Sequence, residues 1–304
     1  MGCGTMKEKR YGNEIKFFIG CVIIIVLFAI FCVLPIILVF SASITDENAL
    51  IAEGYSFWPS TISFSAYKYL WTQRAMIGRS YLVSIFVTVF GTSIGVLVCT
   101  MLAYPLSRKS FRFANLFTFI VFFTMLFNGG TVSSYMVWTR IFHIKNTIYA
   151  LIFPNLMMNA FNVILIKNYF ANSIPDSLIE AAKLDGAKES HIFTKIMIPL
   201  SKPAIVTVAM FSGIAYWNDW TNGLYYINNT KLYSIQLLLN EIQQNISMLK
   251  TANDTFGTVV LDMDLPSSGV RMAIAVVALL PILIIFPLIQ KQLIKGIVIG
   301  AVKG

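Results

Sequence analysis

The chain has 304 residues, of which 57% are hydrophobic and only 12% are charged. Soluble domains are on average about 45–50% apolar and about 25% charged, so this chain lacks the polar surface that a water-soluble particle needs. The composition excludes a soluble enzyme, a soluble nucleic-acid-binding protein and a disordered protein, and it predicts an all-α polytopic membrane protein. The net charge of +9 then indicates basic loops that set the topology, with no nucleic acid as partner.

The first predicted transmembrane helix covers residues 17–42, after a basic cytoplasmic N-terminus of residues 1–16. A spanning helix needs about 20 predominantly apolar residues. This apolar run is longer than the roughly 7–15 residues of a signal peptide's apolar region, so we expect an uncleaved helix. Residues 43–79 follow as an outer segment.

Five more apolar runs predict a helical core over residues 80–295. Two longer connections lie within it, residues 167–202 and residues 225–270, and residues 296–304 form a C-terminal tail. Six transmembrane helices place both termini on the same side of the membrane. The five runs cover residues 80–106, 113–138, 146–166, 203–217 and 272–289, and Asn128-Gly129-Gly130 interrupts the run over 113–138.

The distribution of basic residues predicts which side the termini face. With the N-terminus inside, 15 Lys and Arg residues lie on the inner side and 8 on the outer side. Cytoplasmic loops carry the excess of Lys and Arg in membrane proteins. The prediction is therefore N-in/C-in, with residues 167–202 in the cytoplasm and residues 225–270 outside.

Several chemical motifs can be weighed and set aside. Gly91, Ser93 and Gly95 match the GxSxG nucleophile elbow, but they lie inside an apolar run without a nearby His or Asp. The same two glycines form GxxxG, which allows close helix packing in lipid. His143 and His191 stand far apart and no CxxC occurs, so no metal site is expected. The chain has no P-loop, so ATP would have to be used by another polypeptide.

Three asparagines give the fourth run a polar face. Asn155, Asn159 and Asn162 are spaced by four and three residues, which places them on one side of a continuous helix. One interpretation is a polar wall of a translocation pathway, and the other is hydrogen bonding between helices. The residues leave both open.

The fifth run ends in Trp217 and Asn218, followed by Asp219. Trp217 and Asn218 are further candidates for a substrate pathway. Asp219 is a functional candidate because acidic residues at membrane depth are rare. The favoured alternative places it at the outer interface among the tryptophans that are typical there.

The predicted cytoplasmic segment contains two short helices. Pro175 and Asp176 begin the first helix, and Gly186 ends it. The second is expected over residues 188–198, where Pro199 stops it. One small apolar face on the first helix could enter a groove of a partner or lie on the bilayer surface. That face consists of Leu178, Ala181 and Ala182.

This segment resembles the EAA loop of the permease subunits of ABC importers. The matching residues are Glu180-Ala181-Ala182, Asp185-Gly186-Ala187 and Ile196-Met197-Ile198-Pro199. Trp217-Asn218 and the tail from Lys295 to Gly304 are similar to the carbohydrate branch of that family, and within it to the second permease of maltose-type importers. The similarity extends over nearly the whole chain.

The resemblance implies a type I ABC importer permease fold in a bacterial cell membrane. It implies a coupling helix around Glu180–Gly186, with Glu180 as its charged contact, Gly186 as its turn, and Ala181, Ala182, Asp185 and Pro199 in the same ATPase-coupling site. The implied partners are a homologous second permease, two ATPase subunits that bind ATP and Mg²⁺, and an extracytoplasmic solute-binding protein. The chain itself would then be neither an enzyme nor a cofactor-binding protein.

The implied substrate is a carbohydrate, and the surroundings of Trp217 favour an oligosaccharide. Two alternatives stay open. One is a permease for another solute class, and the other is an ion-coupled secondary transporter, which would need ionisable residues near the middle of its helices and inverted repeats.

Overall fold

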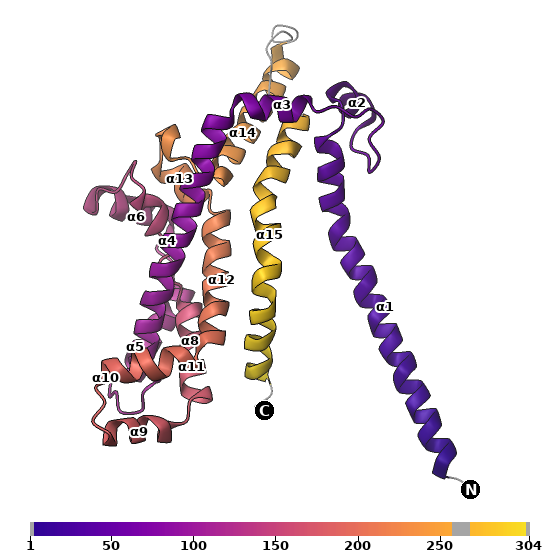
Figure 1. Ribbon diagram of the computed structural model, residues 1–304. Coiled ribbons are helices and arrows are strands. Elements are labelled where there is room, and N and C mark those ends of the chain that lie inside the picture. Colours follow the sequence, from indigo (N-terminus) through magenta and orange to yellow (C-terminus); the bar gives the residue numbers. More distant parts are fainter. Residues whose placement is uncertain (1–2, 257–267, 302–304) are drawn as a thin grey trace. The chain divides into compact units, whose positions relative to one another are not determined.

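The computed structural model describes residues 3–256 and 268–301, and within them the regular structure is helical (Figure 1). An isolated bridge joins Thr45 and Ile62. The chain divides into two compact units. The first contains residues 1–72 and 245–277, and the second contains residues 73–244 and 278–304.

The first unit begins with a long apolar helix, α1 (Cys3–Ser43), of which Phe17–Ser43 is apolar and long enough to span a membrane. Its side chains between Phe17 and Ile36 are largely exposed, as expected for a helix that faces lipid. Two short helices follow, α2 (Glu47–Glu53) and α3 (Ser65–Thr72). The unit also takes in the end of α14 (Ile235–Phe256) and the start of α15 (Ser268–Ala301).

A carboxylate from α2 caps the start of α15. Glu47 Oε1 accepts a hydrogen bond from the Ser268 amide at 2.9 Å, and Glu47 Oε2 accepts one from the Gly269 amide at 3.0 Å. The first amides of a helix have no partner within the helix, and its dipole favours a negative charge there. One side chain therefore joins two segments of this unit that are more than 200 residues apart.

Replacing Glu47 with Ala is expected to lower the free energy of unfolding by about 1 kcal/mol, the usual value of a helix cap. Thermal unfolding of the purified protein measures the loss, and hydrogen exchange at residues 268–271 locates it. The control is Glu53→Ala, at an exposed position on the same helix. Equal melting temperatures for the two variants would contradict the prediction.

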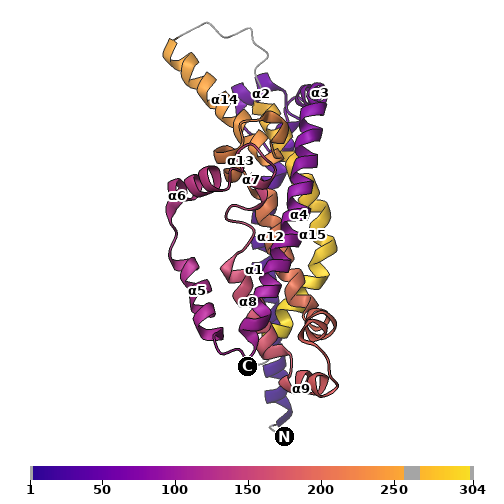
Figure 2. The ribbon, with the colours of Figure 1, turned by 90° about the vertical axis from the view of Figure 1, so that its left-hand side faces the viewer.

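The second unit is built around α4 (Arg74–Ser107), which packs against α8 (Ala160–Ser173) and α12 (Lys202–Asn218). These helices run side by side in both views of the ribbon (Figures 1 and 2). Small residues of α4 permit this close packing. The buried cluster where they meet includes Cys99, Ala103, Val163, Ile166, Phe170, Ile192, Met197 and Val208.

The third apolar run, residues 113–138, is not one straight helix, and it breaks at the predicted Asn128-Gly129-Gly130 interruption. It forms α5 (Ala114–Leu126) and, after a bend of 115°, α6 (Gly130–Met136), which continues as a π-helical turn over Val137–Ile141. Gly130 has φ +82°, a left-handed conformation that glycine adopts without strain. The Asn-Gly-Gly sequence therefore breaks the run, although its hydropathy continues.

The fourth run is also broken, so a continuous helix over residues 146–166 was wrong. Only α7 (Tyr149–Ile152) and the start of α8 are helical, and residues 153–159 between them are not. Pro154 cannot donate to a helical ladder, and Asn155 has φ +62°. Asn159 then caps α8 through its side chain, which accepts a hydrogen bond from the Phe161 amide.

The two glycines of GxxxG make room for different neighbours. Gly91 lies against the Tyr216 ring of α12, and Gly95 lies against the Met157 carbonyl oxygen. The Tyr216 hydroxyl donates a hydrogen bond to the Ile152 carbonyl at 2.8 Å. The packing role is thus as predicted, but one of the two contacts is with non-helical backbone, which sits beside the middle of α4.

The start of α14 and the later part of α15 belong to the second unit, and its remaining helices are short. A turn between α11 and α12 at Ser201 bends the chain by 79°. The short helices are α9 (Asp176–Leu184), α10 (Glu189–His191), a π-helical segment (Ile192–Met197), α11 (Ile198–Leu200), α13 (Thr221–Tyr226) and the 3₁₀ helix Thr230–Leu232.

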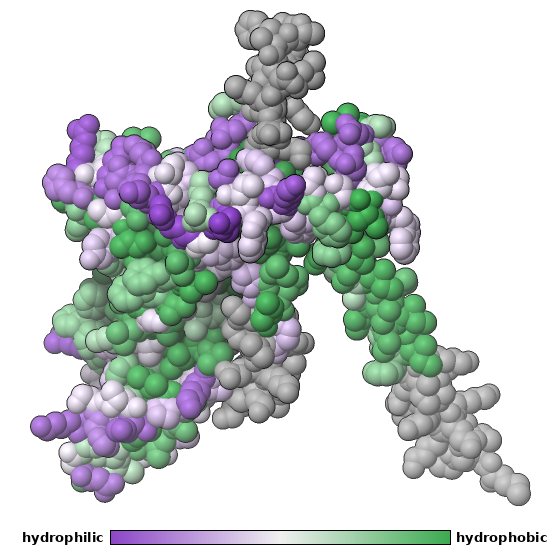
Figure 3. Space-filling view, turned by 45° about the horizontal axis from the view of Figure 1, so that its top comes forward, coloured by the Kyte–Doolittle hydropathy of each residue, from purple (hydrophilic) through white to green (hydrophobic). Residues whose placement is uncertain are grey.

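Two of the described helices are long and apolar enough to cross a membrane alone, and the number rises to four if each bent pair forms one span. Ser268–Ile284 is a shorter apolar helix. The surface around α4 and α12 is hydrophobic between two hydrophilic ends, as a membrane-embedded unit requires (Figure 3). The N-in/C-in orientation stays a prediction.

Candidate functional site

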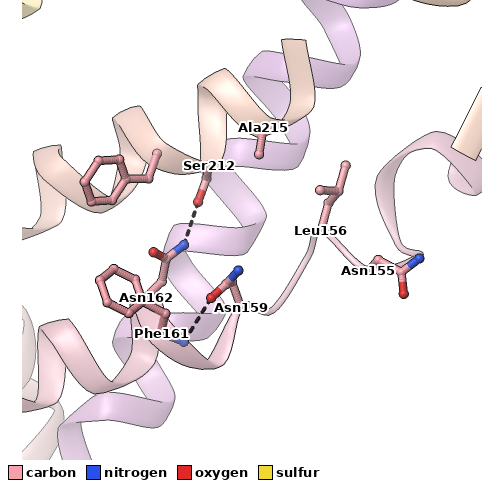
Figure 4. Close-up of a pocket in the computed structure, with 8 residues that line it drawn as sticks. Asn155, Leu156, Asn159, Phe161, Asn162, Ser212 and Ala215 are labelled. Carbon is pink, nitrogen blue, oxygen red and sulfur yellow. Dashed lines mark hydrogen bonds between the residues drawn. The ribbon is translucent and has the colours of Figure 1, made fainter. Parts of the chain in front are cut away.

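A pocket of about 270 Å³ opens beside the non-helical segment of residues 153–159. Three elements supply its walls: that segment, the first turn of α8 and the middle of α12 (Figure 4). The lining residues are Asn155, Leu156, Asn159, Phe161, Asn162, Phe211, Ser212 and Ala215.

The three asparagines all line this pocket, although they do not share a helical face. Asn162 is buried, and its Nδ2 donates to Ser212 Oγ at 3.2 Å. Asn159 stands at the helix start and is exposed, as is Asn155 in the preceding segment. The break in the helix, rather than helical spacing, brings them together. Their role in a substrate pathway stays a prediction.

The other two candidates lie elsewhere. Trp217 is 7% exposed and packs against Ile235, Leu238 and Ala278, so its indole does not reach the pocket. Asn218 Nδ2 donates to the Ile214 carbonyl at 3.0 Å. The structure therefore separates both residues from the asparagines.

Asp219 begins α13. Its Oδ1 accepts hydrogen bonds from the Thr221 amide at 3.1 Å, the Thr221 hydroxyl at 2.8 Å and the Asn222 amide at 3.3 Å. Asn222 in turn donates to the Pro154 carbonyl at 3.0 Å. Asp219 therefore orders the first turn of α13, and Asn222 holds that turn against the start of the non-helical segment.

Two aromatic rings at the pocket were missed by the sequence reasoning. The Phe161 and Phe211 rings have centroids 6.5 Å apart, and both side chains are about half exposed. They come from different helices, fifty residues apart. Many phenylalanines lie in the apolar runs, and nothing in the sequence distinguishes these two.

The chemistry of the pocket suits a hydroxyl-rich solute. Amides donate and accept hydrogen bonds, the Ser212 hydroxyl does both, and no charged side chain lines the cavity. Non-helical backbone at membrane depth occurs where it is buried in protein or lines a water-filled cavity. Residues 153–159 lie beside the middle of α4, so their geometry fits the wall of an aqueous pathway.

The second candidate site is the EAA segment, residues 174–201. Gly186 ends its first helix with φ +80°, where the Gly186 amide donates to the Lys183 carbonyl at 3.0 Å and the Ala187 amide donates to the Ala182 carbonyl at 2.9 Å. This is a Schellman cap. The sequence therefore placed both ends of this helix within two residues.

The exposed face of α9 differs from the predicted one. Ile179 is buried and Ala182 packs against the same core cluster, so Ala182 faces inward. The outward face carries Leu178 and Ala181, and it adds Leu184, which is 89% exposed and was missed. The candidate residues Glu180 and Asp185 are exposed beside this face.

The second helix of the segment does not stop before Pro199, which corrects the prediction. Helical structure runs from Glu189 to Leu200, with a π-helical stretch over Ile192–Met197. Pro199 has no amide to donate to the preceding turn, and the helix ends one residue after it, at Leu200. The chain bends two residues later, at Ser201.

Ionic contacts tie α9 to its surroundings at both ends. Lys109 Nζ lies 2.8 Å from Asp176 Oδ2, and Lys183 Nζ lies 2.6 Å from Glu189 Oε1. The Lys109 hydrogen bond holds the pKa of the Asp176 carboxyl below its usual value. Hydrogen bonds from Lys183 and Tyr104 lower the pKa of Glu189 in the same way. Both carboxylates therefore stay ionised at neutral pH, and these contacts are lost only in acid.

Among the described side chains, no three His, Cys, Asp or Glu residues gather in a way that could hold a metal ion. The two candidate sites are the polar pocket beside residues 153–159 and the exposed helix α9.

Comparison with known proteins places these two sites in context. The model of one protein family, described as binding-protein-dependent transport system inner membrane component, matches residues 91–299. The chain belongs to this family. The matched range contains both the pocket and the EAA segment of this inner membrane component, and it confirms the resemblance to ABC importer permeases.

Relatives match this inner membrane component along nearly its whole length. The polygalacturonan/rhamnogalacturonan transport system permease protein YtcP of Bacillus subtilis (strain 168) is 38% identical over 92% of this chain and 96% of its own. Protein LplC of the same organism is 37% identical over 90% of each chain.

A solved structure shows the same architecture. A chain in the crystal structure of a bacterial ABC transporter involved in the import of the acidic polysaccharide alginate has a TM-score of 0.76 and 30% sequence identity, covering 92% of this chain and 97% of that one. The fold is therefore that of an ABC importer permease, and the protein is a component of the cell membrane.

Proposed function

We propose that this inner membrane component is a permease subunit of an ATP-driven importer for oligosaccharides. The observation that carries the proposal is the near full-length similarity to a polygalacturonan/rhamnogalacturonan permease. The pocket supports it independently, because its amides and its hydroxyl can exchange hydrogen bonds with sugar hydroxyls, and its two phenylalanine rings offer apolar faces to a sugar ring.

An acidic oligosaccharide is the substrate class that we favour. Polygalacturonan is a polymer of a uronic acid, and the structural neighbour takes part in the import of an acidic polysaccharide. Asparagine Nδ2 groups donate hydrogen bonds to carboxylate oxygens as well as to hydroxyls. No acidic side chain among the lining residues would repel such a substrate.

The proposed complex assigns the energy source to other subunits. The chain has no P-loop, so two ATPase subunits would bind ATP and Mg²⁺, and this permease would not be an enzyme. A homologous second permease would complete the pathway, and an extracytoplasmic solute-binding protein would deliver the sugar. In the N-in/C-in orientation, the exposed face of α9 would lie in the cytoplasm, where it would dock on an ATPase subunit.

Uptake into proteoliposomes tests the proposal. The assembled transporter, with ATP inside and its solute-binding protein outside, is expected to accumulate labelled oligogalacturonate. Raffinose serves as an uncharged sugar of similar size, and liposomes without the ATPase subunits serve as the energy control.

Each outcome bears on one part of the proposal. Uptake of oligogalacturonate that depends on ATP supports all of it. Uptake of raffinose alone would overturn the acidic class. Uptake without the ATPase subunits would overturn the importer mechanism and favour a secondary transporter.

A further inference from the structure

Tyr104, three residues before the end of α4, makes a contact that the EAA pattern does not include. Its hydroxyl donates a hydrogen bond to Glu189 Oε2 across 85 residues of sequence. The Tyr104 ring is half-buried, and it packs against Phe193 with centroids 5.1 Å apart and against Phe170 with centroids 6.4 Å apart. Packing against Phe170 and Phe193 therefore restricts the orientation of the Tyr104 ring, and with it the direction in which the hydroxyl points.

Glu189 carries this contact on to α9. Its second oxygen, Oε1, lies 2.6 Å from Lys183 Nζ. Lys183 is in the last turn of α9, three residues before Gly186. One carboxylate thus joins the end of α4 to the end of α9, using a different oxygen for each. In the described structure, α9 is therefore connected to α4 through the polar contacts of Glu189, in addition to the apolar packing of Ile179 and Ala182.

Near its middle, α4 also contacts the non-helical segment that supplies one wall of the pocket. A Cβ at Gly95 would lie 3.0 Å from the Met157 carbonyl oxygen, and Met157 belongs to the non-helical segment that lines the cavity. Gly95 and Tyr104 are nine positions apart on this α-helix, a rise of about 13.5 Å. Because helical hydrogen bonds make this stretch stiff, a displacement at Tyr104 would move the contact at Gly95.

We propose that Tyr104 is a positioning residue of transport, which passes movement of α9 through Lys183 and Glu189 into α4 and so to the wall of the pocket. The inference rests on the proposed function, because it needs an ATPase that moves α9. The inference adds a structural route for coupling, which consists of Lys183, Glu189 and Tyr104.

The ion pair at the other end of α9 provides the internal comparison. Lys109 lies in the loop after α4, and its side chain is 90% exposed. Exposed pairs of this kind contribute little to stability. A loop is also more flexible than a helix. We therefore expect the Lys109–Asp176 pair to contact α9 without transmitting its movement to α4.

Tyr104→Phe in the assembled transporter tests the inference, because it removes only the hydroxyl and keeps the ring contacts. The measurement is the amount of sugar transported per ATP hydrolysed in proteoliposomes. We expect this ratio to fall about fivefold or more, as for the loss of a typical coupling free energy. Glu189→Gln, which can still accept from Tyr104, is expected to keep more of the ratio than Glu189→Ala.

Lys109→Met is the matched control and should leave the ratio unchanged. An unchanged ratio in Tyr104→Phe would overturn the inference, and so would an equal fall in transport and ATPase activity, which indicates a merely structural role. The unsubstituted transporter separates the two proposals. If it shows no ATP-dependent uptake, the proposed function fails first.

Discussion

Uptake is expected to stop when Glu180 is changed to Lys. Glu180 is exposed on α9, beside the apolar positions Leu178, Ala181 and Leu184 that face away from the core. If this face docks on an ATPase subunit, reversing the charge would place a like charge against the partner. Loss of a charge pair at an interface costs roughly 2–5 kcal/mol, which is enough to abolish coupling.

Transport and sugar-stimulated ATPase activity of the purified complex are the measurements for Glu180→Lys. Glu53→Lys makes the same change of charge at an exposed position of α2, and we expect it to transport normally. Gly186→Pro should reproduce the loss at the end of α9, because proline fixes φ near −65° whereas this position has +80°. Normal transport in both Glu180→Lys and Gly186→Pro would contradict a coupling role for α9.

Gly91→Ala is expected to lower the free energy of unfolding by about 1–3 kcal/mol, the usual cost of overpacking a filled core. A Cβ at this position would lie 2.6 Å from Tyr216 Cζ and less than 3.0 Å from two more ring atoms. The ring cannot easily move aside, because Tyr216 is 3% exposed and its hydroxyl is bonded to the Ile152 carbonyl.

The matched control for Gly91→Ala lies on the same helix. A Cβ at Gly78 would meet nothing within 4 Å, so Gly78→Ala should be neutral or slightly stabilising. Thermal unfolding of the purified protein compares the two variants. Equal stability of Gly91→Ala and the unsubstituted protein would show that α4 and α12 can separate at this point without cost.

Local chemistry predicted the EAA segment well. Proline before an acidic residue begins a helix, and a glycine that can take a positive φ ends one, so Pro175, Asp176 and Gly186 specify α9 from sequence neighbours alone. Which face of α9 is exposed depends on what packs beneath it. Ala182 turned inward and Leu184 outward because Ile179 sits in the core cluster, a contact with distant residues.

The apolar runs and the Asn-Gly-Gly interruption of the third run were predicted, but the break of the fourth run was not. A sum of hydropathy over twenty residues hardly registers one proline, although Pro154 ends a helix here. Asn155, Asn159 and Asn162 were grouped correctly for the wrong reason, since the non-helical segment around Pro154 gathers them. Trp217 lies apart from them, because it packs into a buried cluster with Ile235, Leu238 and Ala278.

The sequence by itself determined that this is a helical membrane protein with an EAA segment, because composition, hydropathy and capping act between near neighbours. Only the tertiary structure decided which residues from distant parts of the chain are in contact. The Tyr104 hydroxyl reaches Glu189 across 85 residues, and Phe161 meets Phe211 across fifty. Such pairs depend on how α4, α8 and α12 pack, and that packing follows from contacts between residues far apart in the chain, which no local pattern contains.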